Sequence, residues 1–423
     1  MEREHKSDRV LVLGEEDFPV YASFRDKLRI IVPVCLLISF QQGLSQMGVI
    51  LDNLQSFFPD ASQTMIQMVI AAPSVTAIPV SLCSGILATL FSKKRIGLFA
   101  LCCMLIGGVI PVFFHSSIWD LFFSSGLIGI AQGLIITTST GIFAENFYGK
   151  DRDFAMGLKQ VTDSIGNTII ALAAGFLCQI AWQWAYAVYF LVIPIIFLVW
   201  RYLPDGKPDD KIYSSGSGFG GLRFLIKPHY IFMCIMMAFC GIAVFGFYLN
   251  GSMVVVEKGL GDASLVGIIF SIQNVTTLIF GLLYMPIASV FKKYSLGCSF
   301  IVMVIAYVLF YIGDSVPMYI LAGALWGIGN SLIQSASLVF LANACPKGCY
   351  GLGLAIGNSM INVGISFAPL LINSLRGAIF NNTSPSCALL VVAFICLAAA
   401  CVEFLREIFF VKVDHAEPVG KQS

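Results

Sequence analysis

Twelve long apolar stretches follow one another along the 423 residues of the chain, separated by short polar or charged connections. They are centred near residues 40, 77, 106, 133, 167, 192, 242, 276, 305, 330, 361 and 398. A helix needs about 20 mainly apolar residues to cross the hydrocarbon core of a bilayer. Only 12% of the residues are charged, about half the fraction that a water-soluble domain carries. The sequence therefore predicts an all-α integral, multi-pass membrane protein with twelve transmembrane helices.

The two halves of the chain resemble each other in sequence. The segment Gly129-Ile-Ala-Gln132-Gly133 has a counterpart in Gly327-Ile-Gly-Asn330-Ser331. Two neighbouring segments recur at nearly the same spacing, Ser92-Lys93-Lys94 as Phe291-Lys292-Lys293 and Met156-Gly157-Leu158 as Leu352-Gly353-Leu354. Membrane proteins built from two similar halves usually hold a substrate site between them, near the bilayer midplane. The duplication predicts two pseudo-symmetric six-helix bundles and points toward transport.

Residues 204–227 form the one long polar, glycine-rich segment between the two ends of the chain. This segment lies between the sixth and seventh apolar stretches, and its composition is typical of a flexible linker. The predicted organisation is an N-terminal tail at 1–24, a first bundle at 25–203, the linker at 204–227, a second bundle at 228–412 and a C-terminal tail at 413–423.

Lysine and arginine are concentrated in alternate connections. Five connections on one side hold nearly all of the basic residues that lie between spans: Ser92–Arg95, Gly149–Asp153, Arg201–Lys227, Phe291–Tyr294 and Pro346–Gly348. The connections on the other side hold only Lys258 and Arg376. Because cytoplasmic loops are enriched in basic residues, we expect the N- and C-termini and the linker to be cytoplasmic, in a plasma or inner membrane.

Six plus six helices, with a basic loop after the second span and again after the eighth, resemble the major facilitator superfamily over residues from about 25 to 412. The family motif Gly-x-x-x-Asp-x-x-Gly-Arg-Lys appears here as Gly85-Ile-Leu-Ala-Thr89-Leu-Phe-Ser92-Lys93-Lys94-Arg95, with threonine and serine in place of the aspartate and the second glycine. The resemblance implies the major facilitator fold and transport by alternating access. It also implies that spans 1, 2, 4, 5, 7, 8, 10 and 11 line the path.

Two further family signatures bear on the kind of transporter. The span-four motif Arg-x-x-Gln-Gly ends here as Gln132-Gly133, with Gly129 at the position of the arginine. The Gly-Pro step of the antiporter motif is missing from Ser164-Ile-Gly166-Asn167. These departures argue against a standard proton-driven drug exporter. The segment Gly157-Leu-Lys159-Gln160 is similar to a pattern in cyanate and organic-anion permeases.

Lys159 and Asp163 lie four residues apart in the fifth span, and Asn167 follows one turn later. Residues at this spacing share one face of a helix, and ionisable groups inside a membrane span are expensive and usually functional. One interpretation makes Lys159 an anion-binding charge and Asp163 its counter-ion or a titrating group. In the other, Lys159 extends to the cytoplasmic headgroups and Asp163 neutralises it in a cytoplasmic gate. We assign Asp163 and Asn167 to coupling or gating, together with the basic loop residues Lys93, Lys94 and Arg95.

Amide side chains occur near the middle of the spans expected to line the path. Buried amides need partners, so they either bond across helices or face a wet cavity. Gln132 and Asn330 occupy equivalent positions in the two halves. With Lys159, the predicted substrate contacts are Gln132, Asn330, Gln334, Gln41 and Asn358.

Other chemistries find no support in the sequence. The four histidines lie near predicted ends or loops, so neither a metal site nor a nucleophile–base pair is indicated. No Gly-x-x-x-x-Gly-Lys-Ser/Thr phosphate loop occurs, and a net charge of +1 gives no reason to expect nucleic-acid binding. We expect a monomer that is not an enzyme, has no cofactor, and contacts lipid and a small solute.

The predicted function is secondary active transport of a small solute, an organic or inorganic anion. A proton could couple transport through Asp163, or a counter-anion could be exchanged. Two alternatives remain open at this point. One is an exporter of neutral or amphipathic compounds, and the other is a non-transporting receptor with the same fold.

Overall fold

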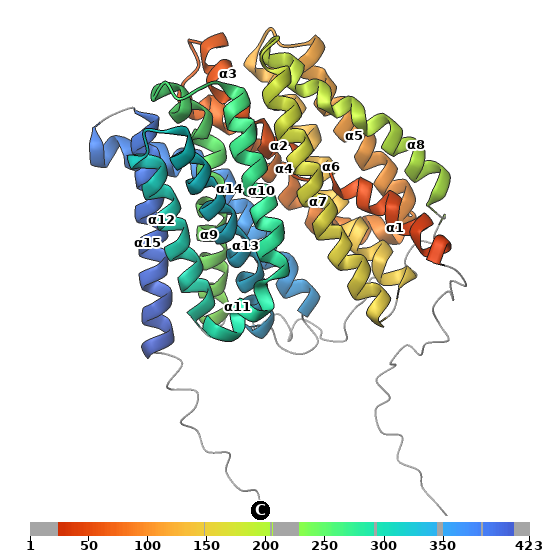
Figure 1. Ribbon diagram of the computed structural model, residues 1–423. Coiled ribbons are helices and arrows are strands. Elements are labelled where there is room, and N and C mark those ends of the chain that lie inside the picture. Colours follow the sequence, from red (N-terminus) through yellow and green to blue (C-terminus); the bar gives the residue numbers. More distant parts are fainter. Residues whose placement is uncertain are drawn as a thin grey trace, which may run out of the picture.

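The computed structural model describes residues 24–147, 149–203, 205, 228–291, 294–344, 350–381 and 384–409. Every regular element in these ranges is a helix (Figure 1). The elements are α1 Phe24–Ile38, α2 Gly43–Gln46, η2 Met47–Ile50, α3 Leu51–Phe57, α4 Gln63–Leu90, α5 Lys93–Phe113, α6 Ile118–Asn146, α7 Gly149–Leu177, η3 Trp182–Leu191, α8 Val192–Tyr202, α9 Pro228–Glu257, α10 Ala263–Leu282, α11 Tyr284–Phe291, α12 Ser295–Ile312, α13 Val316–Ala344, α14 Tyr350–Phe380 and α15 Pro385–Phe409. The predicted tails and nearly all of the predicted linker lie outside the described residues.

The described helices provide the twelve predicted spans. Ten are long and apolar enough to cross a bilayer, and a bent pair within α1–α3 makes an eleventh. The twelfth is α7, which has 29 residues, as many as α6. It is less apolar than the other long helices because Lys159, Asp163 and Asn167 lie in it. The prediction of an all-α, twelve-span fold is therefore confirmed.

The first span differs from the expected continuous helix. Its two parts, Ile30–Ile38 and Gly43–Phe57, meet at an angle of 44°. At the break, the Ser39 hydroxyl donates to the Leu36 carbonyl over 2.7 Å, and the backbone N–H groups of Gln41 and Gly43 donate to carbonyls three residues earlier. Such local bonds compete with helical hydrogen bonding and keep the backbone paired inside the membrane. The break packs against α7 at Gly166, where a side chain would collide with the Ser39 carbonyl.

The glycines that repeat between the two halves of the sequence lie at equivalent helix–helix contacts in the two bundles. Gly129 of α6 lies against Thr76 of α4, and Gly327 of α13 lies against Thr276 of α10. Any side chain at either glycine would overlap the neighbouring helix. Small residues of this kind let helices in membranes approach closely. The internal repeat thus encodes the same helix crossing twice.

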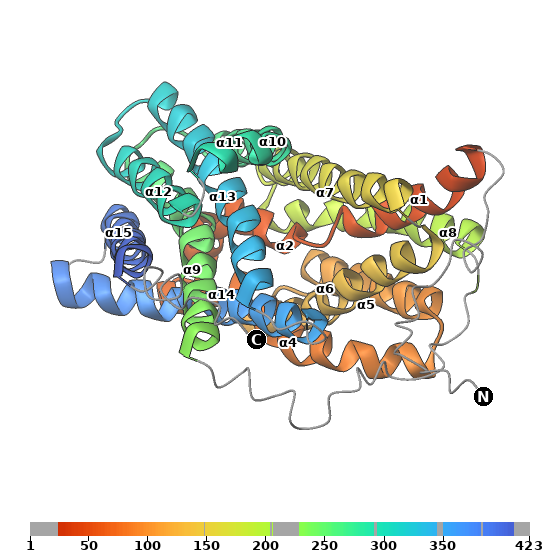
Figure 2. The ribbon, with the colours of Figure 1, turned by 90° about the horizontal axis from the view of Figure 1, so that it is seen from below.

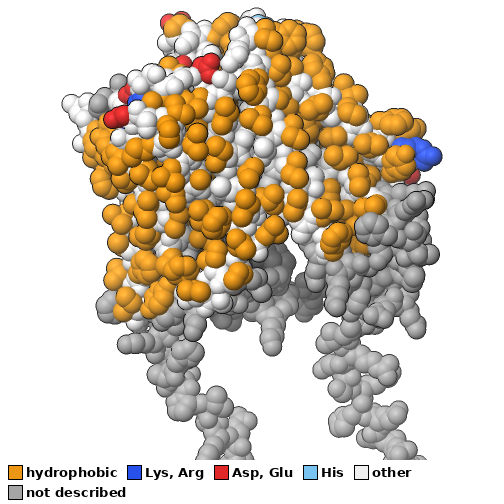
Figure 3. Space-filling view, viewed as in Figure 1, with side chains coloured by type: hydrophobic (Ala, Val, Ile, Leu, Met, Phe, Trp, Pro, Cys, Tyr) orange, Lys and Arg blue, Asp and Glu red, His pale blue; other side chains and the backbone are white. Residues whose placement is uncertain are grey.

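The two bundles meet mainly through α7 with α10 and α4 with α14 (Figures 1 and 2). One end of the molecule carries the connections 58–62 and 258–262. Among the described residues, every side-chain hydrogen bond between the bundles lies in the half of the molecule toward this end. We call this the closed end. At the opposite end, which carries residues 91–92 and 203, Figure 3 shows a notch between the two halves. We call this the open end.

Three amides hold the closed end together. Gln67 of α4, which is completely buried, donates through Nε2 to Asn250 Oδ1 of α9 over 2.9 Å and to the Leu249 carbonyl over 3.0 Å. Its Oε1 accepts from Asn373 Nδ2 of α14 over 2.7 Å, and Asn373 also donates to Thr64 Oγ1 over 2.9 Å. We call Gln67, Asn250 and Asn373 the amide latch. It joins one helix of the first bundle to two of the second.

Replacing Gln67 by leucine is expected to loosen the closed end. The substitution removes three hydrogen bonds between the bundles and leaves the other two latch amides short of partners, each at a penalty of about 1–3 kcal/mol. Hydrogen exchange of the backbone amides of residues 249–255 should become faster. Gln55→Leu is the matched control, because Gln55 donates to Ala61 of its own bundle. Equal exchange in the two variants would contradict the role of the latch.

Candidate functional site

Lys159 lies on α7 where it faces α1 and α6. Its ammonium donates to Thr140 Oγ1 of α6 over 2.9 Å, and it is in electrostatic range of Cys35 on α1 and of Asp163 one turn further along α7. The side chain is half-buried. Among the described residues, no carboxylate forms an ion pair with this ammonium within 4 Å. A hydroxyl therefore holds the lysine, and its charge is not neutralised by direct contact.

Asp163 and Asn167 continue the same helix toward the midplane. Asn167 is 5% exposed, and its side chain is in interaction range of the Asp163 carboxylate one turn earlier on α7. One oxygen on each side chain, Asp163 Oδ1 and Asn167 Oδ1, is buried without a hydrogen-bond partner. The pair therefore presents two adjacent acceptors that lack a donor, an arrangement that is unfavourable in a dry interior.

The break in the first span brings amides of both bundles to the middle of the molecule. Gln42 Oε1 accepts from Gln132 Nε2 of α6 over 3.3 Å. Gln46 Oε1 accepts from Asn274 Nδ2 of α10 over 3.2 Å. Tyr248 of α9 is in interaction range of Gln46 and of Asp163. Among the predicted contacts, Gln132 thus lies near the break, and Gln41 is also there but buried at 8% exposure.

The remaining predicted contacts form a separate group in the second bundle. Asn330 of α13 donates to Thr277 Oγ1 of α10 over 3.4 Å and accepts from Gln334 Nε2 over 3.1 Å. Gln334 is exposed, and Asn358 on α14 is half-buried. Among the described residues, none of these three side chains hydrogen-bonds Lys159, Asp163 or Asn167. The predicted set therefore divides into two groups, one in each bundle.

The three basic residues assigned to gating begin α5 at the open end. Lys94 pairs with Asp205 over 3.6 Å, which links the start of α5 to the residues that follow α8. The Lys93 side chain packs against α6 at Gly141, and Arg95 is exposed. Lys93 therefore reaches α6 next to Thr140, the residue that holds the Lys159 ammonium.

Glu403 lies in the last two turns of α15, and the structure buries it completely. Its carboxylate pairs with Arg406 of the same helix over 2.8 Å. The guanidinium lies between the rings of Phe232 and Phe340, at 5.6 and 5.4 Å from their centroids. The i, i+3 spacing of the pair was the available signal. These contacts lie inside the second bundle and support a structural role.

Several other polar residues were not selected from the sequence. They are Gln46, Gln67, Thr140, Tyr248, Asn274, Asn373 and Arg376. Gln46, Gln67, Asn274 and Asn373 have hydrogen-bond partners from distant parts of the chain, and no local pattern indicates those contacts. Only the recurrence of amides in the path-lining spans could have indicated these four.

Comparisons with known proteins agree with this architecture. The family model of the Major Facilitator Superfamily matches residues 30–261 and 242–422. No curated protein sequence is similar enough to count as a match. Among solved structures, the POT family transporter PepTSo has a TM-score of 0.73 at 12% identity, covering 94% of this chain and 100% of its own.

Two other solved structures show the same fold. The nucleoside transporter NupG has a TM-score of 0.73 at 12% identity, with 90% of this chain and 99% of its own covered. A D-xylose-proton symporter has a TM-score of 0.70 at 14% identity, with 90% and 98% covered. At these identities the likeness concerns the fold, and the matched family model spans nearly the whole chain. The chain thus belongs to the Major Facilitator Superfamily and is a transporter, not an enzyme.

Proposed function

We propose that this transporter moves a small organic or inorganic anion by alternating access, with Lys159 as the anion-binding charge. The observation that carries this proposal is the bonding of the ammonium, which contacts the Thr140 hydroxyl over 2.9 Å and pairs with none of the described carboxylates. A lysine inside a span that keeps its charge is a functional candidate. Exchange of a hydroxyl partner for an oxyanion would strengthen the hydrogen bond, because it adds the attraction between two opposite charges.

The direction in which the structure opens follows from the distribution of basic residues. Lys93, Lys94 and Arg95 lie at the open end, and basic residues favour the cytoplasmic side. On this proposal the structure is open to the cytoplasm, with both termini on that side. Transport would then require the amide latch to part and the open end to close.

Asp163 is the proposed coupling group. A proton on Asp163 Oδ1 would turn that acceptor into a donor and could satisfy Asn167 Oδ1, so that one proton would pair both unpartnered oxygens. A proton symporter among the solved relatives supports this form of coupling. Because Lys159 is in electrostatic range of Asp163, anion binding at the lysine and protonation of the acid would influence each other.

A neutral polar solute is the second candidate. The amide pairs Gln42–Gln132 and Asn330–Gln334 suit hydroxyl groups, and two of the solved relatives are named for a nucleoside and for D-xylose. In that case the Lys159–Thr140 contact would be structural. The first experiment below separates these candidates.

Replacing Lys159 by alanine is expected to weaken anion binding and to leave folding intact. The probes are benzoate, lactate, succinate, citrate, phosphate and sulfate, with glucose and uridine as uncharged controls. Thermal unfolding of the purified protein measures binding, because any ligand of the folded state stabilises it. At least one anion should raise the melting temperature of the wild type, and Lys159→Ala should lower its affinity by about tenfold or more, as expected when a charged hydrogen-bond partner is lost.

Arg201→Ala is the matched control for this experiment, since Arg201 is an exposed cation at the end of α8. It should bind the same anion as the wild type does. Stabilisation by glucose or uridine, unchanged in Lys159→Ala, would contradict the anion proposal and favour the neutral solute.

Replacing Asp163 by asparagine is expected to uncouple transport from the proton gradient. The asparagine carries no titrating proton, so the anion should still exchange across proteoliposomes at equal pH. Uptake driven by a pH gradient should fall by about tenfold or more, the scale on which removal of a proton-transferring group acts. Asp60→Asn, at an exposed position in the connection before α4, should leave both activities unchanged. Gradient-driven uptake that survives in Asp163→Asn would show that coupling runs elsewhere.

A further inference from the structure

Arg376 is a buried cation near the closed end of the second bundle. It lies on α14 about one turn before that helix ends, and its side chain is 5% exposed. Its Nε and Nη1 atoms are buried without a hydrogen-bond partner. The ion pairs within the described part of the chain do not include it. Arginine keeps its charge in proteins, so this charge requires an explanation.

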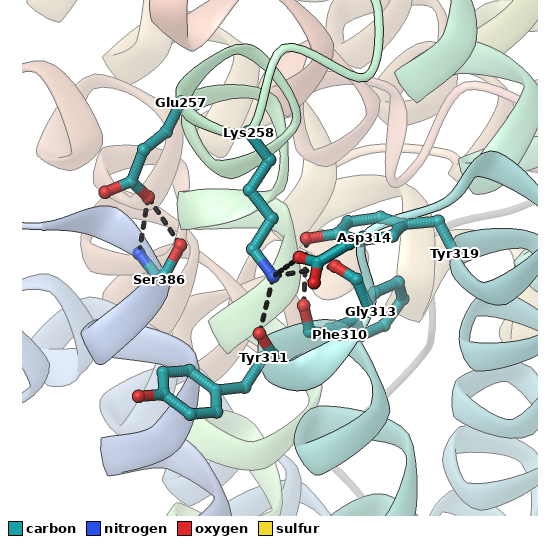
Figure 4. A network of polar contacts seen from close by, with 8 residues as sticks. All are labelled: Glu257, Lys258, Phe310, Tyr311, Gly313, Asp314, Tyr319 and Ser386. Atoms are coloured by element: carbon teal, nitrogen blue, oxygen red, sulfur yellow. Dashed lines mark hydrogen bonds and ion pairs between the residues drawn. The ribbon is translucent and has the colours of Figure 1, made fainter.

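Direct contact with a described carboxylate does not neutralise Arg376. Glu257 of α9 is in electrostatic range, but its carboxylate is bound to the start of α15 (Figure 4). It accepts from the Ser386 backbone N–H over 3.0 Å, from Ser386 Oγ over 2.5 Å, and from the Ser384 hydroxyl. A carboxylate at a helix N-terminus is well placed there. Glu257 therefore serves as a cap for α15.

A second acidic group at the closed end, Asp314, is also paired. Lys258 Nζ lies 3.4 Å from the Asp314 carboxylate and donates to the carbonyls of Tyr311 and Gly313 over 2.5 and 2.7 Å (Figure 4). The same ammonium lies 5.9 Å from the centre of the Tyr319 ring. The only other lysine or arginine predicted for this side is thus fully bonded, whereas Arg376 is not.

Arg376 lies beside the amide latch. Asn373 precedes it by three residues on α14, and residues at this spacing are neighbours on a helix surface. Asn373 Nδ2 bonds Thr64 and Gln67 of the first bundle, while its Oδ1 is buried without a partner. Separation of α4 from α14 at the latch would therefore open the surface next to the guanidinium.

We propose that Arg376 forms a second anion site, which takes a carboxylate or another oxyanion when the closed end opens. A guanidinium presents donors in a planar fork that matches such groups, and an isolated buried charge is strongly unfavourable unless it is paired. The inference rests on the proposed function, because it makes Arg376 the first contact of the transported anion on the side opposite Lys159. The two cations then serve the two faces of one alternating-access cycle.

Thermal unfolding of full-length protein tests the site separately from Lys159. In a Lys159→Met background, citrate, succinate, benzoate, phosphate and sulfate are titrated at constant ionic strength. At least one should give a saturable rise in melting temperature, larger when Gln67→Leu loosens the latch. Adding Arg376→Met should remove that rise, whereas adding Arg201→Met should not. If no anion gives a rise that depends on Arg376, the inference is wrong.

The same variants separate a binding role from a structural one. Methionine has similar length and no charge, so Arg376→Met should be at least as stable as the wild type without added anion. A lower melting temperature there would mark Arg376 as structural and overturn the proposal. An Arg376-dependent rise alongside normal transport by Lys159→Ala would instead contradict the role proposed for Lys159 and leave the second site standing.

The last measurement compares the half-saturating anion concentration from the two sides of the membrane. In oriented proteoliposomes, Arg376→Met should raise the half-saturating concentration of the stabilising anion at the closed-end side by about tenfold, as for the loss of a charged hydrogen-bond partner. From the open-end side it should stay close to the wild-type value. Equal effects from both sides would overturn the assignment of Arg376 to one face.

Discussion

Polar groups inside the spans must find partners within the protein, because the lipid core offers none. This constraint accounts for most of the contacts that organise the middle of the molecule. The break in the first span keeps its backbone paired through short turns and presents Gln42 and Gln46 to α6 and α10. The closed end depends on Gln67, which has partners on two helices of the other bundle. Where a buried polar atom has no partner, as at Asp163 and Arg376, the same constraint points to a ligand or a proton.

The twelve spans and the two bundles could be predicted because they depend on local composition and on a repeat that is visible in the sequence. Gly129 and Gly327 occupy matching positions, and each lies against a threonine of the neighbouring helix. The break at residues 39–42 could not be predicted. The stretch Ser39-Phe-Gln41-Gln42-Gly43 is locally polar, but polar residues also occur inside unbroken helices such as α7. The break packs against Gly166 and Gln132 of helices far along the chain, and no local pattern contains those contacts.

The candidate site was predicted in part for the same reason. Lys159 and Asp163 stand out because charge is rare in a span, whereas the distance between their charged groups depends on rotamers and on Thr140. Arg376 was assigned to a connection because it lies near the end of an apolar stretch. Its burial depends on how α9 and α15 pack around α14, which no local pattern contains.

The closed end is held by neutral amides, whereas the two proposed anion sites are charged, and this difference suits alternating access. The latch consists of neutral amides, and parting them exposes polar groups that water can satisfy without leaving a charge unpaired. An ion pair in the same place would be harder to open, since separation strands two charges in a poorly solvated interface. With a neutral latch, a modest difference in anion affinity between the two states is enough to shift the equilibrium between them. On the proposed function, Lys159 and Arg376 keep their charge for the solute, and the amides control which of the two it can reach.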